Sequence, residues 1–387
     1  MEDLSRELQE LKEATREFVV REVEPIAQKL HLKGDEIPDD LLRKMIDMGF
    51  FRLMASPEWG GLGMGAVAMT VVTEELCRGW FSVGALPSRN WGTANALEKF
   101  GTEAQKKKWL PGIVSGEIQA AHACTEPEAG SDAAALKTSA TLGNGVYRVT
   151  GTKQWCTQAN RADVLKVFCR TGASSKRHGG ISMLLCEKPR GEQFVPPTLT
   201  GQRIDTIGYH GMHTYSLFFD GHEIPEENLL GGVEGQGFRH LMVGYELART
   251  RFAFSCIGLA RAAFEAALQY SRDRVQFGQP ICNFQAIRGK LADMATHIEA
   301  ARQLGYACAR KLDAGLRVDQ EAGMLKLFAS EMAQMVCREA VQIHGGNGFA
   351  TDMPVNRYWR DSCLLTIGEG TSEIQREVIA RRLLGER

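Results

Sequence analysis

Several features that mark particular classes of protein are missing from this sequence of 387 residues. The ten cysteines stand at least thirteen residues apart, so no CxxC pair exists. That spacing disfavours zinc ribbons, thioredoxin-like redox sites and clustered iron–sulfur ligands. We therefore expect reduced cysteines that fill the core, and no metal site.

Long apolar runs and a surplus of charge are also missing. A membrane-spanning helix needs about eighteen consecutive apolar residues, and no segment approaches that length. The N-terminal segment MEDLSRELQELKEATREF is acidic and amphipathic, unlike a signal or transit peptide, so we expect a cytoplasmic protein. Lys and Arg number 46 against 47 Asp and Glu, which leaves a net charge of −1 and no general attraction to nucleic acid or anionic membranes.

The periodicity of the chain changes twice and predicts three domains. Residues 1–117 have helical spacing, 118–231 carry β-rich runs such as YRVTGTKQW and ISMLLCE, and 232–387 return to helical spacing. The order α, β, α without βαβ alternation predicts an α+β protein and argues against a Rossmann nucleotide domain.

Local signals refine this division. Pro25 is expected to kink or break the first helical segment, and the glycine cluster at 60–65 lacks GxGxxG spacing and is expected to be a loop. The Asp-Gly pair at 220–221 predicts a turn. Apolar stripes over 284–313 and 319–344 predict helices that face a bundle.

Two motifs of the β region suit a flat or anionic ligand. TEPEAGSD, residues 125–132, combines hydroxyls with turn formers, which fits a phosphate or a flavin edge and equally fits a surface turn. In KQWCTQ, Trp155 and Thr157 share one face of a strand, as a heterocycle site requires. A buried tryptophan beside a satisfied threonine is the alternative.

Three motifs of the C-terminal helical region carry further candidates. Arg274, beside Gln276 in SRDRVQFGQPI, is placed either to reach a pyrophosphate or to complement a helix dipole. In QIHGGNGF the glycines allow close approach of a ligand, whereas His344 alone is expected to be structural.

The third of these motifs, IGEGTSEIQ, contains a candidate base. Glu369 stands between two glycines after an apolar run, and desolvation there would raise its pKa as a general base requires. Most glutamates, in contrast, are solvated. The following helix is expected to start at Thr371 or Ser372, with Ser372 as a possible N-cap.

In this order, these five motifs resemble the acyl-CoA dehydrogenase family over residues 5–385. The resemblance implies an N-terminal helical domain, a middle β domain and a C-terminal four-helix bundle, assembled as a homotetramer. It implies FAD as cofactor, oxidation of an acyl-CoA to the trans-2-enoyl-CoA, hydride transfer to flavin N5, and an electron-transfer flavoprotein as acceptor. Other readings on the same fold are an enoyl-CoA reductase, a flavin oxidase or monooxygenase, and a non-catalytic acyl-CoA-binding homologue.

The resemblance also assigns residues. The catalytic base is Glu369. The residues assigned to FAD are Thr125, Ser131, Trp155, Thr157, Arg274, Gln276, Gln285, Gln342, Gly345, Gly346, Thr371 and Glu373. Those that reach the FAD of a partner subunit are Arg274, Gln276 and Gln285, and those of the adenine-side loop are Gln342, Gly345 and Gly346. The residues assigned to acyl-CoA are Ser131, Glu246, Arg249 and Gly370.

Several positions depart from the family pattern. Gly368 stands where an aromatic residue is frequent, His213 where Arg or Lys is frequent, and Glu128 where a small residue is common. The base position of the isovaleryl-type branch is Ala248 here, so Glu369 has no rival there.

The segment that lines the far end of the acyl pocket in the family carries Ser88, Arg89, Asn90 and Trp91. An inward Arg89 would favour a distal carboxylate or another polar function, because burial of an unpaired guanidinium is costly. An inward Trp91 would favour cyclic or aromatic acyl groups. The alternative is an Arg89 that points to solvent or pairs with an acidic neighbour.

Overall fold

The N-terminal part of the chain is helical. The computed structural model describes residues 4–172 and 178–385. Six helices precede the first strand: α1 Arg6–Phe18, α2 Glu24–Lys33, α3 Asp39–Asp47, α4 Gly65–Gly79, α5 Phe81–Phe100 and α6 Glu103–Ser115. A π-helical turn, Val19–Val23, joins α1 to α2, so the irregularity expected at Pro25 lies just before the proline. Pro25 itself occupies the first turn of α2, where a backbone N–H has no partner within the helix and its loss costs nothing. The glycine cluster at 60–65 is a loop up to the start of α4.

The middle part forms one curved sheet. Its strands are β1 Ala120–Ala123, β2 Ser139–Gly143, β3 Val146–Thr157, β4 Val164–Arg170, β5 Ile181–Glu187, β6 Leu199–Ile204 and β7 Thr214–Pro225. The strand order is β1-β4-β2-β3-β7-β6, and β5 pairs with the other side of β4. Buried side chains of the sheet, such as Tyr147, Leu165 and Phe219, pack together in a separate hydrophobic core.

The turn expected at Asp220–Gly221 is wrong. Both residues lie within β7, which pairs with β3 from Thr214 to Pro225. Gly221 has a positive φ of 63°, and the register between β3 and β7 shifts beside it. The glycine therefore serves an irregularity in a continuous strand pair, a local conformation that the dipeptide alone does not distinguish from a hairpin turn.

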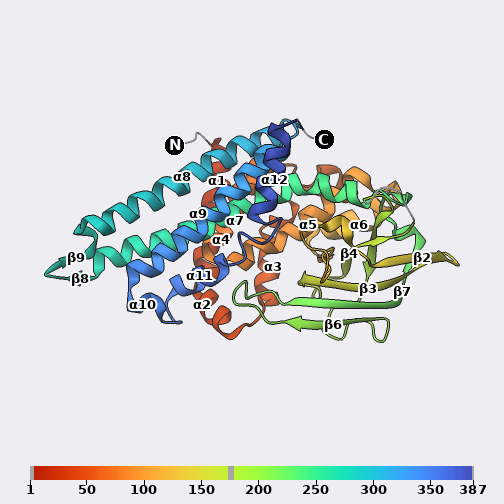
Figure 1. The fold of residues 1–387 in the computed structure, drawn as a ribbon, viewed down its shortest axis with the longest axis horizontal. Helices are drawn as coiled ribbons and strands as arrows, with labels where there is room; N and C mark the ends of the chain where they lie inside the picture. Colours follow the sequence, from red (N-terminus) through yellow and green to blue (C-terminus); the bar gives the residue numbers. More distant parts are fainter. Residues whose placement is uncertain (1–3, 173–177, 386–387) are drawn as a thin grey trace.

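The C-terminal part is a helical bundle. Its elements are α7 Gly237–Asp273, the short strands β8 Val275–Gln276 and β9 Gln279–Pro280, α8 Gln285–Asp313, α9 Asp319–His344, α10 Gly346–Phe349, α11 Pro354–Ser362 and α12 Ser372–Leu383. Helix α7 packs against α8, α9 and α4, so the bundle shares its core with the N-terminal helices. In Figure 1 the bundle extends to the left, to the β8–β9 hairpin and α10, while the sheet lies to the right.

A network of buried ion pairs joins α4 to α7 and α8. Glu74 of α4 accepts from Arg302 of α8 at 2.9 and 3.1 Å and from Arg261 of α7 at 3.1 Å, and its neighbour Glu75 accepts from Arg261 at 2.7 Å and from Arg16 at 3.0 Å. Burial alone would raise the pKa of Glu74, but Arg302 and Arg261 lower it to about 2. We call Glu74, Glu75, Arg16, Arg261 and Arg302 the paired network.

The described residues also limit the kinds of site that the fold can hold. No helix among them is long and apolar enough to cross a bilayer, and no group of three or more His, Cys, Asp or Glu side chains is arranged to hold a metal ion. Seven of the ten cysteines are buried and all ten are free thiols, as their scattered spacing predicts.

Candidate active site

Glu369 lies on the turn between α11 and α12 in a left-handed conformation, with φ +56°. Two fully buried side chains fix this turn. Lys326 of α9 donates from Nζ to the carbonyl oxygen of Gly370 at 2.7 Å, and Gln375 donates from Nε2 to the carbonyl oxygens of Glu369 and Gly370 at 3.1 Å. No described residue accepts a hydrogen bond from the backbone N–H of Glu369. This donor is therefore available to a ligand beside the carboxylate.

The surroundings of the Glu369 carboxylate differ from the dry, apolar pocket expected from the sequence. The side chain is 30% exposed, and Nη2 of Arg251 lies 3.9 Å from its Oε1. Arg251, on α7, is buried and donates from Nη1 to Ser255 at 3.2 Å. The prediction of an apolar enclosure was wrong because it considered only the residues adjacent in the chain, whereas Arg251 arrives from another helix.

Further basic side chains gather on the same side. His122 of β1 and Lys166 of β4 are direct partners in the parallel β1–β4 register, so their side chains leave the same face of the sheet. Helix α5 crosses this face with Gly92, where a Cβ would lie 3.7 Å from Nζ of Lys166 and 3.9 Å from Nε2 of His122. Arg89 stands one helical turn before Gly92 and therefore faces the same pair. We call Arg89, His122, Lys166 and Arg251 the basic cluster.

The basic cluster is held in a poorly solvated space. Burial lowers the pKa of Lys166 to about 7, although Glu369 acts in the opposite direction. Burial also lowers the pKa of His122 well below its ordinary value, and the charges of Lys166, Arg89 and Arg251 add to this effect. Yet His122 is an exposed residue between two buried alanines of β1. The ring therefore borders an internal space rather than packing in the core.

Only Arg89 of this cluster stands in a segment that the family resemblance assigns to the acyl pocket. The other three carry a signal that could have been used: His122 and Lys166 are single basic residues in otherwise apolar strand segments, AAHA and VLKVF. Such a residue needs a partner or a cavity. What the sequence does not contain is the strand register that sets the two side by side.

The polar neighbours of Arg89 turn into the structure. Ser88 donates to Ala85, Asn90 donates to Ile113 and Ile118, and the indole N–H of Trp91 donates to Phe50 at 3.0 Å within the N-terminal core. The expectation for an inward Trp91 in the acyl pocket is therefore wrong. Arg89 itself donates to the carbonyl of Ala85 at 3.0 Å and to the hydroxyl of Tyr209 at 3.2 Å, so it does not point freely to solvent.

Trp155 and Thr157 lie at the end of β3, where the register against β7 is interrupted. Trp155 has φ +60° and is 54% exposed, while Cys156 between the two is buried. The alternative of a buried tryptophan is therefore wrong. Thr157 lies 3.1 Å from the hydroxyl of Thr214. An indole left uncovered on a rigid strand beside a hydroxyl fits one side of a flavin ring.

The TEPEAGSD segment packs beside this strand end. Gln154 donates to the carbonyl of Thr125 at 2.8 Å, and the buried carboxylate of Glu126 accepts from Lys153 at 2.8 Å and from two backbone N–H groups. Ser131 is exposed. Glu128 pairs with Lys137 at the surface, so its charge is compensated away from the basic cluster.

The start of α12 and the middle of α7 complete this side. Thr371 is the N-cap of α12, and its hydroxyl accepts a hydrogen bond from the backbone N–H of Ile374. Ser372 is therefore not the cap but lies buried in the first turn, where Glu373 is exposed. On α7, burial lowers the pKa of Arg249, which stacks on the ring of Tyr245 at 5.1 Å. Glu246 accepts from the backbone of Val318 and makes no ion pair with Arg249 among the described residues.

The remaining cofactor candidates lie far from Trp155. Arg274, Gln276, Gln285, Gln342, Gly345 and Gly346 are all exposed. They belong to the β8–β9 hairpin, the start of α8 and the turn before α10, at the left end of Figure 1, whereas β3 lies to the right. At the same end, His344 stacks on Tyr270 at 4.2 Å and donates from Nδ1 to Ala340, so its role is structural, as expected. One chain therefore does not bring the two groups of candidates together.

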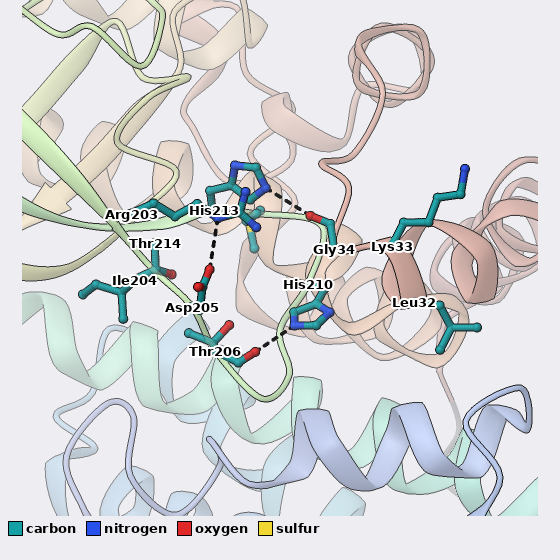
Figure 2. A pocket seen from close by; sticks show the side chains of 11 residues that line it. Leu32, Lys33, Gly34, Arg203, Ile204, Asp205, Thr206, His210, His213 and Thr214 are labelled. Atoms are coloured by element: carbon teal, nitrogen blue, oxygen red, sulfur yellow. Dashed lines mark hydrogen bonds and ion pairs between the residues drawn. The ribbon is translucent and has the colours of Figure 1, made fainter.

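The positions that depart from the family pattern have ordinary structural environments. A Cβ at Gly368 would meet Leu364 and Phe252 at 3.6 Å, a normal contact, so the space before Glu369 admits a side chain that this chain lacks. Ala248 is a half-buried residue of α7. His213 lines a cavity of about 250 Å³ between the α2–α3 loop and the sheet, shown in Figure 2. Its Nε2 donates to Gly34 at 3.1 Å, so it links the N-terminal helices to the sheet.

Comparison with known proteins accounts for this arrangement. Family models match the chain in three parts: the acyl-CoA dehydrogenase N-terminal domain at residues 5–117, the middle domain at 121–222 and the C-terminal domain at 235–384. The (2S)-methylsuccinyl-CoA dehydrogenase of Cereibacter sphaeroides is 42% identical over 98% of this chain and 70% of that protein.

Solved structures have the same fold. Butyryl-CoA dehydrogenase of Megasphaera elsdenii is 35% identical, with a TM-score of 0.93 over 99% of this chain and 100% of that one. A chain from the structure reported for the electron transferring flavoprotein of Acidaminococcus fermentans is 36% identical, with a TM-score of 0.94 and the same coverage. The protein described here thus belongs to the acyl-CoA dehydrogenase family and is an FAD-dependent oxidoreductase.

Proposed function

We propose that this chain dehydrogenates an acyl-CoA thioester between its α and β carbons, with Glu369 as the base that removes the α-proton. The observation that supports this assignment most directly is the rigid turn that presents the Glu369 carboxylate and an unused backbone N–H side by side. A base needs a fixed position more than any other property, and Lys326 and Gln375 provide it here.

The roles of the chain's own groups follow from this geometry. The carboxylate of Glu369 accepts the α-proton, and the Glu369 N–H donates to the thioester oxygen, where negative charge develops. FAD, when bound, supplies the acceptor for the hydride that leaves the β carbon. Loss of the proton and the hydride together leaves the trans-2-enoyl thioester. Arg251, 3.9 Å from Glu369, places a positive charge beside the carboxylate.

The cofactor contacts are proposed to come from two copies of the chain. Thr125, Trp155, Thr157, Thr371 and Glu373 would hold the flavin side within one chain. Arg274, Gln276 and Gln285, at the opposite end of the molecule, would reach the FAD of a partner in a homotetramer. We extend this role to the adenine-side residues, because they lie at the same exposed end. Arg274→Ala should lower FAD content and weaken the oligomer together, measured by flavin absorbance and analytical ultracentrifugation. Full FAD content in a stable mutant oligomer would contradict the two-copy site.

The likeness to a chain from a structure of an electron transferring flavoprotein supports such a protein as the electron acceptor. The names of the relatives do not choose the acyl group, since methylsuccinyl-CoA carries a free carboxylate and butyryl-CoA does not.

The function is tested by anaerobic titration of the purified holoenzyme with a panel of acyl-CoAs. We expect bleaching of the flavin absorbance by at least one saturated acyl-CoA, loss of bleaching in Glu369→Gln, and partial activity in Glu369→Asp. A colourless protein, or a flavin that no saturated thioester reduces, would overturn the proposal. Rapid reoxidation of the reduced flavin by oxygen during turnover would favour an oxidase.

A further inference from the structure

The basic cluster contains more positive charge than the chain compensates. Arg89 and Arg251 are permanently charged, and Lys166 has neither a hydrogen bond nor an ion pair to any described residue. The only carboxylate within ion-pair distance of any cluster member, among the residues that the structure describes, is Glu369, which faces Arg251 at 3.9 Å. Buried cations are normally paired, because their desolvation is otherwise uncompensated.

The unused donors converge on one space. Lys166 is 3% exposed and its Nζ approaches the open side of Gly92 together with Nε2 of His122. Arg89 uses two donors, for Ala85 and Tyr209, so three of its five N–H groups remain. Arg89 lies three residues before Gly92 on α5 and therefore on the same face of the helix, the face that Lys166 and His122 approach. A guanidinium and an ammonium on one side of a helix suit a carboxylate.

We propose that the basic cluster binds a carboxylate at the far end of the acyl chain, so that the substrates are CoA monothioesters of short dicarboxylic acids. This inference rests on the proposed function, because Glu369 marks the position of the α and β carbons. Arg251 lies 3.9 Å from Glu369, so the cluster begins beside the reacting carbons and favours a short acyl chain. Arg89 and Lys166 are the residues that select it, and Gly92 provides its room.

A neutral fatty acyl group fits this space less well. It would place methylene groups against the buried Arg251 and Lys166 and the half-buried Arg89, and it would offer none of these cations a hydrogen-bond acceptor. The CoA phosphates do not serve as the missing anion, because Lys166 and Arg251 are enclosed between α5, α7 and the sheet, next to the reacting carbons rather than at the surface.

The test compares a carboxylate with a neutral group of the same shape. Thioether analogues of glutaryl-CoA and of its terminal carboxamide lack the thioester carbonyl and are not oxidised, so their dissociation constants from the wild-type holoenzyme can be measured by calorimetry. The CoA part is identical and cancels. We expect the carboxylate to bind about tenfold or more tightly than the carboxamide. Arg89→Leu and Lys166→Met should each remove most of this preference without weakening the carboxamide.

Arg203→Leu is the matched control, since Arg203 lies in the cavity of Figure 2, outside the acyl site, and this variant should keep the full preference. Equal affinity for carboxylate and carboxamide in the wild type, or a preference that survives both cluster substitutions, would overturn the inference. Because the analogues are not oxidised, this outcome is independent of turnover: flavin bleaching by butyryl- to octanoyl-CoA would then leave the proposed function intact. Failure of every saturated thioester to bleach the flavin would instead overturn the function.

Discussion

The paired network and the basic cluster both use arginines of α7, yet they treat buried charge in opposite ways. In the paired network, Glu74 and Glu75 meet Arg261 and Arg302 at 2.7–3.1 Å, so each buried charge has a partner within the fold. In the basic cluster, Lys166 has no such partner among the described residues, and the one of their carboxylates that pairs with Arg251 is the proposed catalytic one. The paired network joins the N-terminal helices to the C-terminal bundle. The basic cluster instead keeps positive charge without a counterion, at a place where a substrate would supply one.

The largest expected difference between the two regions concerns turnover. Glu369→Gln removes the proton acceptor while it preserves size, so acyl-CoA oxidation should fall by roughly two orders of magnitude or more. Fold and FAD content should remain, because Lys326 and Gln375 hold the turn through backbone oxygens that the variant keeps. The measurement is single-turnover flavin reduction with far-ultraviolet circular dichroism as the control. A rate within a factor of a few of wild type would assign the base to another residue.

The same substitution in the paired network should act on stability instead. Glu74→Gln leaves Arg261 and Arg302 buried without one of their carboxylates, and removal of one partner of a buried ion pair costs about 3–5 kcal/mol. Urea denaturation should therefore show a large loss in the free energy of unfolding, with per-molecule activity of the folded variant little changed. Arg6→Gln is a suitable control, because the Arg6–Glu10 pair is exposed and contributes little. An equally small effect of both variants would mean that the network does not stabilise the joint.

Acid should weaken the paired network over a defined range. The pKa of Glu74 is lowered to about 2 in the folded protein, below its ordinary value of 4.5, so the unfolded chain binds its proton first as the pH falls. The stabilisation is fully present above pH 4.5 and is lost as the pH falls toward 2, at up to about 1.4 kcal/mol per pH unit. The stability gap between wild type and Glu74→Gln should therefore narrow over this range. A gap that stays constant from pH 6 to pH 2 would show that this ionisation does not contribute.

The smallest effect is expected from removal of an unpaired charge. Lys166→Met should stabilise the ligand-free protein by about 1 kcal/mol or more, since an unpartnered buried charge disappears. Burial lowers the pKa of Lys166 in the folded protein to about 7, although the attraction of Glu369 opposes this shift. The ordinary value, which applies to the unfolded chain, is 10.5. Between these two pH values the unfolded chain therefore binds one proton more than the folded protein. The penalty is full below pH 7 and disappears as the pH rises toward 10.5, and the advantage of the variant should disappear with it. A destabilised variant at pH 7 would mean that Lys166 has a structural partner.

Much of the fold could be predicted from the sequence. The helices at 285–313 and 319–344 and the strands of the middle region follow directly from periodic apolar residues. The failures are local choices between two backbone conformations. Asp220 and Gly221 have turn chemistry, but pairing of β7 with β3 on both sides keeps the strand continuous. Thr371 and Ser372 are both good caps, and the buried position of Ser372 decides between them.

The site was accessible from the sequence only where its residues stand in one motif. Glu369, Trp155 and Thr157 belong to motifs of that kind. The basic cluster consists of residues from α5, β1, β4 and α7, so it depends on tertiary packing. Similarly, the exposed position of Trp155 depends on an interrupted register and a left-handed backbone that the strand pattern does not contain.

If the basic cluster binds the acyl carboxylate as proposed, one position of helix α5 sets how the acyl specificity of this chain can evolve. Gly92 is the point at which the helix leaves open the space before His122 and Lys166, and an added Cβ would make only normal contacts there. Alanine would therefore be tolerated, whereas a longer aliphatic side chain would occupy the room of the proposed carboxylate. A single mutation at a residue without charge or catalytic role could thus convert recognition of a charged acyl end into recognition of a shorter neutral one, and neutral drift at this site offers a route between substrate ranges within the family.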